Sequence, residues 1–311
     1  MAILVKDPGL ATTVQDLGCY GHSHLGVSPA GAADSLSFRI ANLLVGNYEN
    51  APALEMTLIG ATLQFAESKI IAVAGATCSF QINGREVAFA QAIEIDAGSV
   101  VQIGRMTTGV RAYLAMQGGI DVPLMMGSAS THLGARFGGF EGRMLRKGDR
   151  LRVHDGTGSR PRATPSGVLT HAQVVLPGSL RVTRGSQQEW FDAEAFTVLL
   201  SSPFAVTDQA GRSGLRLRGR SILPRNASQL LTDGVPLGAI QIPPDGQPII
   251  LFVDQQTTGG YPKIANVIAA DMHLVGQLRA RDTVRFTEVS IEHATALLRQ
   301  QELWLKQIFT N

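Results

Sequence analysis

The chain has 311 residues, of which 44% are hydrophobic and 17% are charged, and its formal net charge is +2. This composition is typical of a folded globular protein and excludes a disordered chain, while the length favours two domains over one. Because the Lys and Arg residues are scattered rather than gathered in a basic stripe, we expect no nucleic-acid partner.

Neither secretion nor membrane insertion is indicated. The segment 1–7 lacks the charged head, long apolar middle and cleavage site of a signal peptide. The longest apolar stretch, residues 70–77, is too short to span a bilayer. We therefore expect a cytoplasmic protein. The two cysteines, Cys19 and Cys78, form no Cys-x-x-Cys pair, which favours free thiols over a disulfide framework or a cysteine-based zinc site.

In chain order, the first strong element is a helix over residues 34–46, capped by Asp34 and ended by Gly46. Next, Asn83-Gly84 separates two alternating runs in residues 79–89, the pattern of a two-residue hairpin, because both turn positions must tolerate a positive φ. Short β-branched or aromatic runs bounded by Gly, Pro or Asp predict further strands at residues 100–103, 111–116, 204–207, 249–253 and 283–286.

Two further helices and a domain boundary complete the predicted organisation. Residues 154–166 are rich in turn formers and poor in large apolar groups, which places a boundary between a β-rich domain at 1–155 and a second domain at 167–311. The spacing of Ser186-Gln187-Gln188-Glu189 predicts a capping box that opens a helix, and Ser290 opens a helix that reaches the C-terminus. The fold class is therefore mainly β.

Several common cofactor motifs are missing from the sequence. There is no P-loop, no Gly-x-Gly-x-x-Gly fingerprint after a predicted strand, no Gly-x-Ser-x-Gly elbow and no biotinyl-lysine segment. His22 and His24 could share one face of an extended segment, but no third ligand stands at a recognisable spacing. Surface or structural roles are favoured for them, and we expect no metal.

The most distinctive polar stretches are residues 238–248 and 254–263. Gly259 and Gly260 leave backbone N–H groups unobstructed for a carbonyl oxygen or an anion, while Tyr261 and Lys263 add a phenol and a positive charge. Arg212 is a further candidate anion clamp. On residue types alone, a plain turn between strands is as good an interpretation as a site.

The order of these pieces resembles the carboxyltransferase-domain family known as allophanate hydrolase subunit 2, which includes the C subunit of 5-oxoprolinase. The segments that carry the resemblance run nearly end to end: 13–18, 26–34, 41–47, 53–57, 113–123, 138–143, 234–248 and 257–263.

The resemblance implies two domains with cyclophilin-like β barrels and a few short helices. It implies a partner that resembles the B subunit of 5-oxoprolinase and a separate protein that resembles its A subunit. Together these open 5-oxoproline to glutamate, with ATP bound in the complex. Related domains in urea carboxylase move a carboxyl group from carboxybiotin to urea. Both chemistries activate an amide-like carbonyl, which suits a preorganised polar pocket.

If the resemblance holds, we expect Lys263 to contact the substrate or a phosphate and Tyr261 to orient the substrate. The N–H groups of Gly259 and Gly260 are expected to stabilise an oxyanion. Four residues are expected to bind substrate around them, with the loops near 212, 241 and 260 lining one cavity: Thr258, Arg212, Gln241 and Gln247.

The sequence also departs from the family pattern. Cys19 stands where Arg is common in the family, and Gln255 stands where His or Arg is frequent. Thr232-Asp233 replaces Ser-Glu. Ala210-Gly211 stands where Ser-Asp is usual, which removes the charge partner expected beside Arg212.

Two alternatives remain open. One is the carboxyltransferase component of a biotin-dependent urea or amide carboxylase, with biotin carried on another chain. The other is a non-catalytic binder that regulates a kinase-inhibitor protein.

Overall fold

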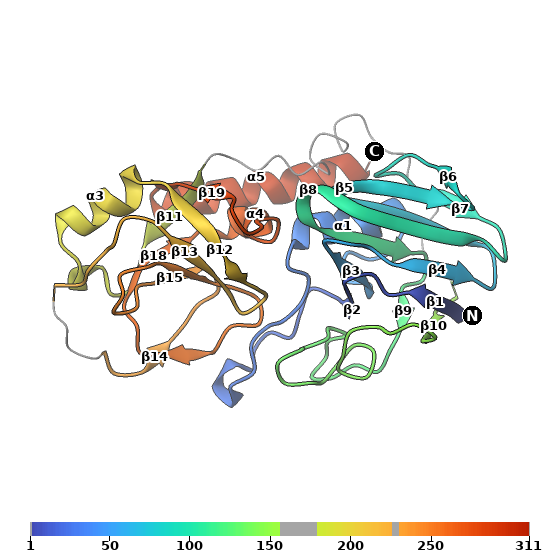
Figure 1. The fold of residues 1–311 in the computed structure, drawn as a ribbon, viewed down its shortest axis with the longest axis horizontal. Helices are drawn as coiled ribbons and strands as arrows, with labels where there is room; N and C mark the ends of the chain where they lie inside the picture. The colour runs from blue at the N-terminus through green and yellow to red at the C-terminus, as the bar shows by residue number, and fades with distance from the viewer. Residues whose placement is uncertain (1, 156–178, 226–229, 311) are drawn as a thin grey trace. The chain divides into compact units, whose positions relative to one another are not determined.

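The computed structural model describes residues 2–155, 179–225 and 230–310, which divide into two compact units (Figure 1). The first unit contains residues 2–19, 30–155 and 305–310 of the described chain, and the second contains 20–29 and the described residues from 179 to 304. The boundary predicted at 154–166 lies almost wholly outside the described residues.

Both units are built on a nearly closed, barrel-like sheet, so the predicted mainly β fold class is confirmed. The sheet of the first unit has the strand order β2-β3-β8-β4-β1-β10-β9, and β5, β6 and β7 join it through β8 and β5. Its strands are β1 (Ala2–Asp7), β2 (Ala11–Gln15), β3 (Ala53–Thr57), β4 (Thr62–Phe65), β5 (Lys69–Ile82), β6 (Arg85–Glu86), β7 (Ile93–Ile95), β8 (Val100–Met116), β9 (Ile120–Asp121) and β10 (Arg150–Val153).

The longest strand, β8, corrects the prediction of two separate strands at 100–103 and 111–116. Residues 104–110 contain two glycines and several exposed side chains, which look like a break in the sequence. They continue the strand because β8 pairs with β5 from Met116 back to Val101, with register shifts around residues 75–80. Long-range pairing thus overrides the local signal.

Two local predictions in the first unit are confirmed. Asn83 and Gly84, with φ of 51° and 77°, form the two-residue turn between β5 and β6, in which Ile82 pairs with Arg85. Helix α1 (Ser35–Leu44) begins at Asp34, whose carboxylate accepts a hydrogen bond from the Ser37 N–H at 2.9 Å. Beyond the end of α1, Gly46 has a φ of 78°.

The sheet of the second unit has the order β19-β12-β13-β16-β15-β18-β11-β20, and β14 and β17 form a separate pair. Its strands are β11 (Leu180–Arg184), β12 (Phe204–Ala210), β13 (Gly214–Arg218), β14 (Asp233–Gly234), β15 (Ala239–Gln241), β16 (Ile249–Leu251), β17 (Thr258–Gly259), β18 (Lys263–Val267), β19 (Thr283–Val284) and β20 (Phe286–Glu288). The β11–β20 pair is parallel, whereas β15 pairs antiparallel with both β16 and β18.

The helix predicted to open at Ser186 is wrong. Residues 188–190 form only a 3-10 turn, Phe191 is extended, and α3 (Ala193–Ser201) begins instead at Asp192, whose carboxylate accepts from the Ala195 N–H at 2.8 Å. The helix opened by Ser290 is confirmed as α5 (Ile291–Thr310). Two short 3-10 helices (Ser23–Leu25 and Ala269–Asp271) and α4 (Met272–Val275) complete the described helices.

No helix in the described parts of the chain is both long enough and apolar enough to cross a membrane. Both cysteines are free thiols, as predicted, and burial raises the pKa of the Cys78 thiol to about 12.

Candidate functional site

Lys263 is the most unusual residue of the second unit. It opens β18, where a register shift opposite Ile240 and Gln241 inserts one extra residue into the strand. Such a bulge redirects side chains, and Lys263 and Ile264 are both buried. The Lys263 side chain is 1% exposed, and its Nζ has no hydrogen-bond partner among the described residues. A buried ammonium left in this state is costly, which marks the position as a candidate for ligand binding.

The counter-charge comes from Asp233 in β14. Its Oδ2 lies 3.5 Å from the Lys263 Nζ, an ion-pair distance rather than a hydrogen bond. The Gly234 N–H donates to the Asp233 carboxylate, and this bond together with the positive charge of Lys263 holds the Asp233 pKa below its ordinary value. The carboxylate is therefore ionised at neutral pH.

Gln187 connects these two residues. Its Nε2 donates to Asp233 Oδ2 at 2.9 Å, and its Oε1 accepts from the Lys263 backbone N–H at 3.1 Å. Gly185 lets the chain pass this closely, because a Cβ there would lie 2.1 Å from the Lys263 carbonyl oxygen. The segment predicted to form a capping box thus supplies a side chain to this cluster.

Gln241 and Gln256 extend this group of residues. Gln241 is its register partner in β15, and the Gln241 Nε2 donates to the Tyr261 carbonyl oxygen at 3.4 Å. Gln256 in turn donates to Gln241 Oε1 at 3.5 Å. We call Gln187, Asp233, Gln241, Gln256 and Lys263 the lysine cluster.

Gly259 and Gly260, the two glycines of the predicted site, do not form a nest of left-handed backbone. The lack of a side chain at Gly259 instead leaves room for Gln241. Gly259 pairs with Asp233 between β17 and β14, and a Cβ on Gly259 would lie 2.9 Å from Gln241 Nε2. Neither Gly259 nor Gly260 has a positive φ. Of the predicted residues, Gly259, Tyr261 and Lys263 all lie next to Gln241. Thr258 is exposed and pairs with Gly234, and Gly260 follows Gly259 in the chain.

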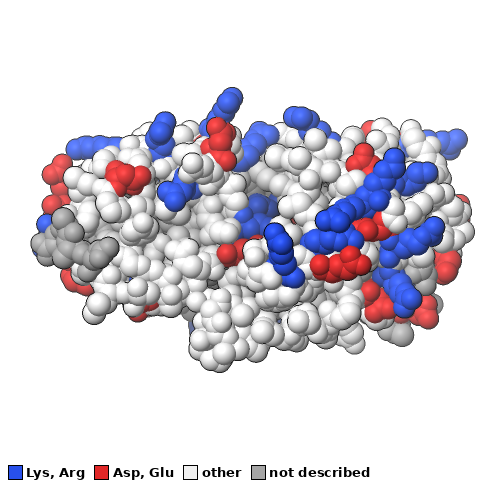
Figure 2. Space-filling view, turned by 60° about the horizontal axis from the view of Figure 1, so that its bottom comes forward, with Lys and Arg blue, Asp and Glu red and all other residues white. Residues whose placement is uncertain are grey.

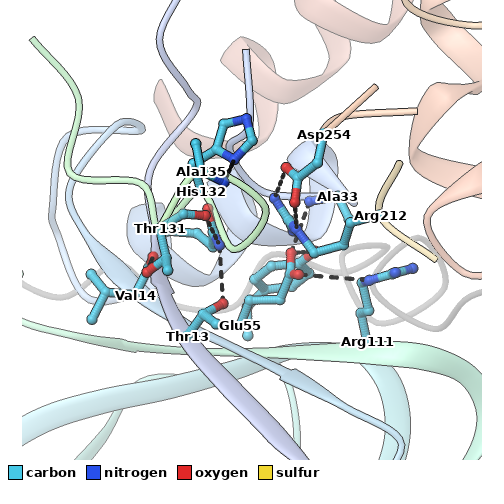
Figure 3. Close-up of polar contacts among 12 residues, drawn as sticks. Thr13, Val14, Ala33, Glu55, Arg111, Thr131, His132, Ala135, Arg212 and Asp254 are labelled. Carbon is cyan, nitrogen blue, oxygen red and sulfur yellow. Dashed lines mark hydrogen bonds and ion pairs between the residues drawn. The ribbon is translucent and has the colours of Figure 1, made fainter. Parts of the chain in front are cut away.

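Arg212 lies in a different cluster, and its charge partner comes from elsewhere in the chain. Its Nε and Nη2 each contact the Asp254 carboxylate at 2.9 Å (Figure 3). The Asp254 N–H also donates to the Arg212 carbonyl oxygen at 2.9 Å. The charge partner of Arg212 is thus a carboxylate 42 positions away in the chain.

Gln247 belongs to neither cluster. Its Oε1 accepts from the Gly219 N–H at 2.9 Å, and it lines a cavity of about 540 Å³ that also contains Arg216, Arg218 and Arg281. Gln255, at another departure from the family pattern, is buried and ties its loop to the Val235 carbonyl oxygen at 2.9 Å.

The first unit holds a buried polar cluster that the sequence did not reveal. Glu55 is 1% exposed and accepts from the Ala33 N–H and the Tyr113 hydroxyl, both at 2.8 Å, while Arg111 lies 3.6 Å from the Glu55 carboxylate (Figure 3). Burial and the charge of Glu55 raise the pKa of Tyr113 well above its ordinary value.

A second buried carboxylate in the first unit is Asp16. It accepts from the Ser128 and Ser130 hydroxyl groups at 2.6 and 2.5 Å and from the Ala129 and Gly18 N–H groups at 2.7 and 2.8 Å. These bonds fix the segment 128–130 against the end of β2. In the described parts of the chain, no three His, Cys, Asp or Glu side chains are grouped as metal ligands would be.

The chain belongs to the family described as carboxyltransferase domain, subdomain A and B, whose model matches residues 25–288.

Among its relatives, the C subunit of 5-oxoprolinase from Escherichia coli (strain K12) is 39% identical over 300 residues, which span 96% of this chain and 95% of that protein. The subunit of the same name from Haemophilus influenzae is 36% identical over 304 residues, spanning 98% and 96%. Urea amidolyase of Lachancea kluyveri is 33% identical over 325 residues, which span 97% of this chain but 18% of that protein.

Solved structures agree with this assignment. The urea amidolyase of K. lactis matches with a TM-score of 0.93 at 33% identity, covering 99% of this chain and 20% of that one. The protein TTHA0988 matches with a TM-score of 0.79 at 36% identity, covering 92% and 55%.

Proposed function

We propose that the chain is the C subunit of an ATP-dependent 5-oxoprolinase, which opens 5-oxo-L-proline to L-glutamate together with partners of the A and B types. The full-length similarity to proteins named as C subunits of 5-oxoprolinase supports this proposal. ATP is assigned to the complex and not to named residues of this chain.

The observation that carries the proposal is the unsatisfied ammonium of Lys263. Its Nζ has no hydrogen-bond partner among the described residues, although its side chain is 1% exposed. An oxygen of a lactam carbonyl, a carboxylate or a phosphoryl group would accept from it, and charge that develops on that oxygen would be stabilised. Lys263 is therefore assigned the contact to the reacting oxygen.

The neighbouring residues are assigned supporting roles. Asp233 supplies the counter-charge of Lys263, and Gln187 fixes both residues in place. The amide groups of Gln241 and Gln256 can donate to a polar ligand, and Tyr261, which is 43% exposed, can orient it. The N–H groups of Gly259 and Gly260 remain proposed oxyanion donors, and Thr258 remains a proposed substrate contact.

The test uses the complex of all three proteins with Lys263→Met. We expect 5-oxoproline-dependent ADP release and glutamate formation to fall at least about a hundredfold, in line with the loss of an electrostatic contact to the reacting oxygen. Lys147→Met, at an exposed lysine of the first unit, is the matched control and should retain full turnover. Unchanged turnover in a correctly assembled Lys263→Met complex would remove Lys263 from the site.

A second candidate is the carboxyltransferase part of a biotin-dependent urea carboxylase. The TM-score of 0.93 to a urea amidolyase supports it. Its test is carboxylation of urea with a carboxybiotin-bearing carrier supplied on a separate chain. Turnover of urea without turnover of 5-oxoproline would favour this function over the first.

A further inference from the structure

A cavity of about 440 Å³ lies in the first unit, and its lining includes no residue of the lysine cluster. Its residues come from β9, β10 and the segment 122–142. Much of its wall is apolar, formed by the side chains of Val122, Pro123, Met125, Phe137 and Phe140. A cavity of this volume and lining is of the kind that takes a small organic molecule.

Three arginines line this cavity. Arg150 and Arg152 are exposed and alternate along β10 with the buried Leu151 and Val153, so both side chains leave the same face of the sheet. Arg136 joins them from the facing segment. None of the three guanidinium groups has an ion-pair or hydrogen-bond partner within the described residues.

Two carboxylates line the cavity, fewer than the three arginines. Glu141 is engaged by Arg143, with 2.6 Å between its Oε2 and Nη2, and Asp121 is the strand partner of Arg152. Figure 2 shows Lys and Arg side chains gathered over the first unit, with Asp and Glu between them. The cavity thus combines an apolar wall with an excess of positive charge.

Three glycines fix the shape of the cavity wall, because a side chain at any of these positions would clash with the backbone or with a neighbouring residue. Gly138, Gly139 and Gly142 all have a positive φ. A Cβ on them would lie 2.1 Å from the Ser130 carbonyl oxygen, 1.9 Å from the Thr131 hydroxyl and 2.2 Å from the Arg136 carbonyl oxygen, respectively. The Arg143 guanidinium lies 5.1 Å from the Phe140 ring centre and holds that ring in place.

Arg136 has a φ of 57°, a conformation that non-glycine residues rarely adopt. Its N–H donates to the His132 carbonyl oxygen at 2.8 Å, so the unusual backbone is held by the surrounding loop. The loop thus holds Arg136 in a fixed backbone conformation in the lining of the cavity.

From this combination we propose that the cavity binds a small amphipathic organic anion. The apolar body of the ligand packs against Phe137 and Phe140, and its oxyanion head group is held by Arg136, Arg150 and Arg152. This site is independent of the lysine cluster and of the proposed function.

The test uses the full chain and two fluorescent probes of similar shape, the anion anilinonaphthalene sulfonate and its uncharged analogue phenylnaphthylamine. In Arg150→Gln/Arg152→Gln, we expect the dissociation constant of the anion to rise at least about tenfold, and that of the uncharged probe to stay within about twofold. Decanoate should displace the anionic probe from the wild-type chain.

The matched control is Arg85→Gln/Arg105→Gln, which removes the same charge from exposed arginines outside the cavity. This variant should bind both probes as the wild type does. The proposal is overturned if the control weakens anion binding as much as the cavity variant. It is also overturned if the cavity variant binds the anion normally, or if the uncharged probe binds the wild type as tightly as the anion does.

Discussion

The Lys263 ammonium lies 3.5 Å from the Asp233 carboxylate, yet the two side chains are 1% and 58% exposed. The cation is therefore desolvated while its counter-ion faces water, and the attraction between them offsets only part of the desolvation. Such an arrangement lowers the stability of the fold, and a protein retains it where the charge serves binding or catalysis.

The first prediction concerns the stability of Lys263→Met. An apolar side chain of similar volume removes the desolvated charge, so we expect the free energy of unfolding to rise on the order of 1 kcal/mol, although turnover is lost. Urea denaturation measures the change, and Lys147→Met should stay within about 0.5 kcal/mol of the wild type. A loss of about 2 kcal/mol or more in Lys263→Met would show instead that the lysine is a structural residue.

The second prediction compares Gly185 and Gly259, two glycines near the lysine cluster. In Gly185→Ala the new Cβ would meet the Lys263 carbonyl oxygen at 2.1 Å, a backbone contact that cannot yield, so we expect a loss of about 2–3 kcal/mol. In Gly259→Ala the new Cβ would meet Gln241 Nε2 at 2.9 Å, the end of a side chain that can move. We expect a loss below about 1 kcal/mol there.

Activity should separate the same two variants. Gly259→Ala displaces the Gln241 amide and should raise KM for 5-oxoproline in the assembled complex while the unfolding temperature stays close to that of the wild type. If Gly259→Ala unfolds as readily as Gly185→Ala, or leaves KM unchanged, the assigned role of Gly259 in spacing Gln241 is wrong.

The third prediction concerns Asp16. Its carboxylate is 2% exposed and accepts from two hydroxyl and two N–H groups. Asp16→Ala leaves these buried donors without an acceptor, so we expect a loss of about 3 kcal/mol or more in the free energy of unfolding. Ser128→Ala removes a single donor and should cost about 1 kcal/mol. Equal losses in the two variants would contradict the assignment of Asp16 as the centre of this network.

The features that the sequence revealed are those encoded by neighbouring residues. The Asp34 cap, the Asn83-Gly84 turn and the Ser290 helix each depend on a few adjacent positions. The capping box at Ser186 failed, because the chain is extended at Phe191 and the helix begins only after Asp192. Gln187 instead makes contacts to Asp233 and Lys263 that span 46 and 76 positions.

The candidate site was predicted only in part for the same reason. The chain segment 258–263 carries its own signal in Gly259, Gly260 and Lys263, but the partners Asp233 and Asp254 are brought in by strand pairing and loop closure. No local pattern identifies which distant carboxylate will face Lys263 or Arg212. The position of Asp233 relative to Lys263, for example, follows from the pairing of β14 with β17 and of β15 with β18.

The fourth prediction is the acid dependence of stability through Asp149. Arg143 contacts both Asp149 carboxylate oxygens, at 2.7 and 3.1 Å, and its hydrogen bonds hold the Asp149 pKa below the ordinary value of 3.8. Because the folded-state pKa is lowered, this contribution is fully present above about pH 4 and is lost as the pH falls through the lower folded value. Asp149→Asn should lower the free energy of unfolding at neutral pH by about 1–3 kcal/mol and flatten its decline as the pH falls below about 4. Asp208→Asn, at an exposed carboxylate, is the control and should keep the wild-type decline. An unchanged acid limb in Asp149→Asn, measured by urea denaturation across this pH range, would show that the Arg143–Asp149 pair contributes nothing to folding.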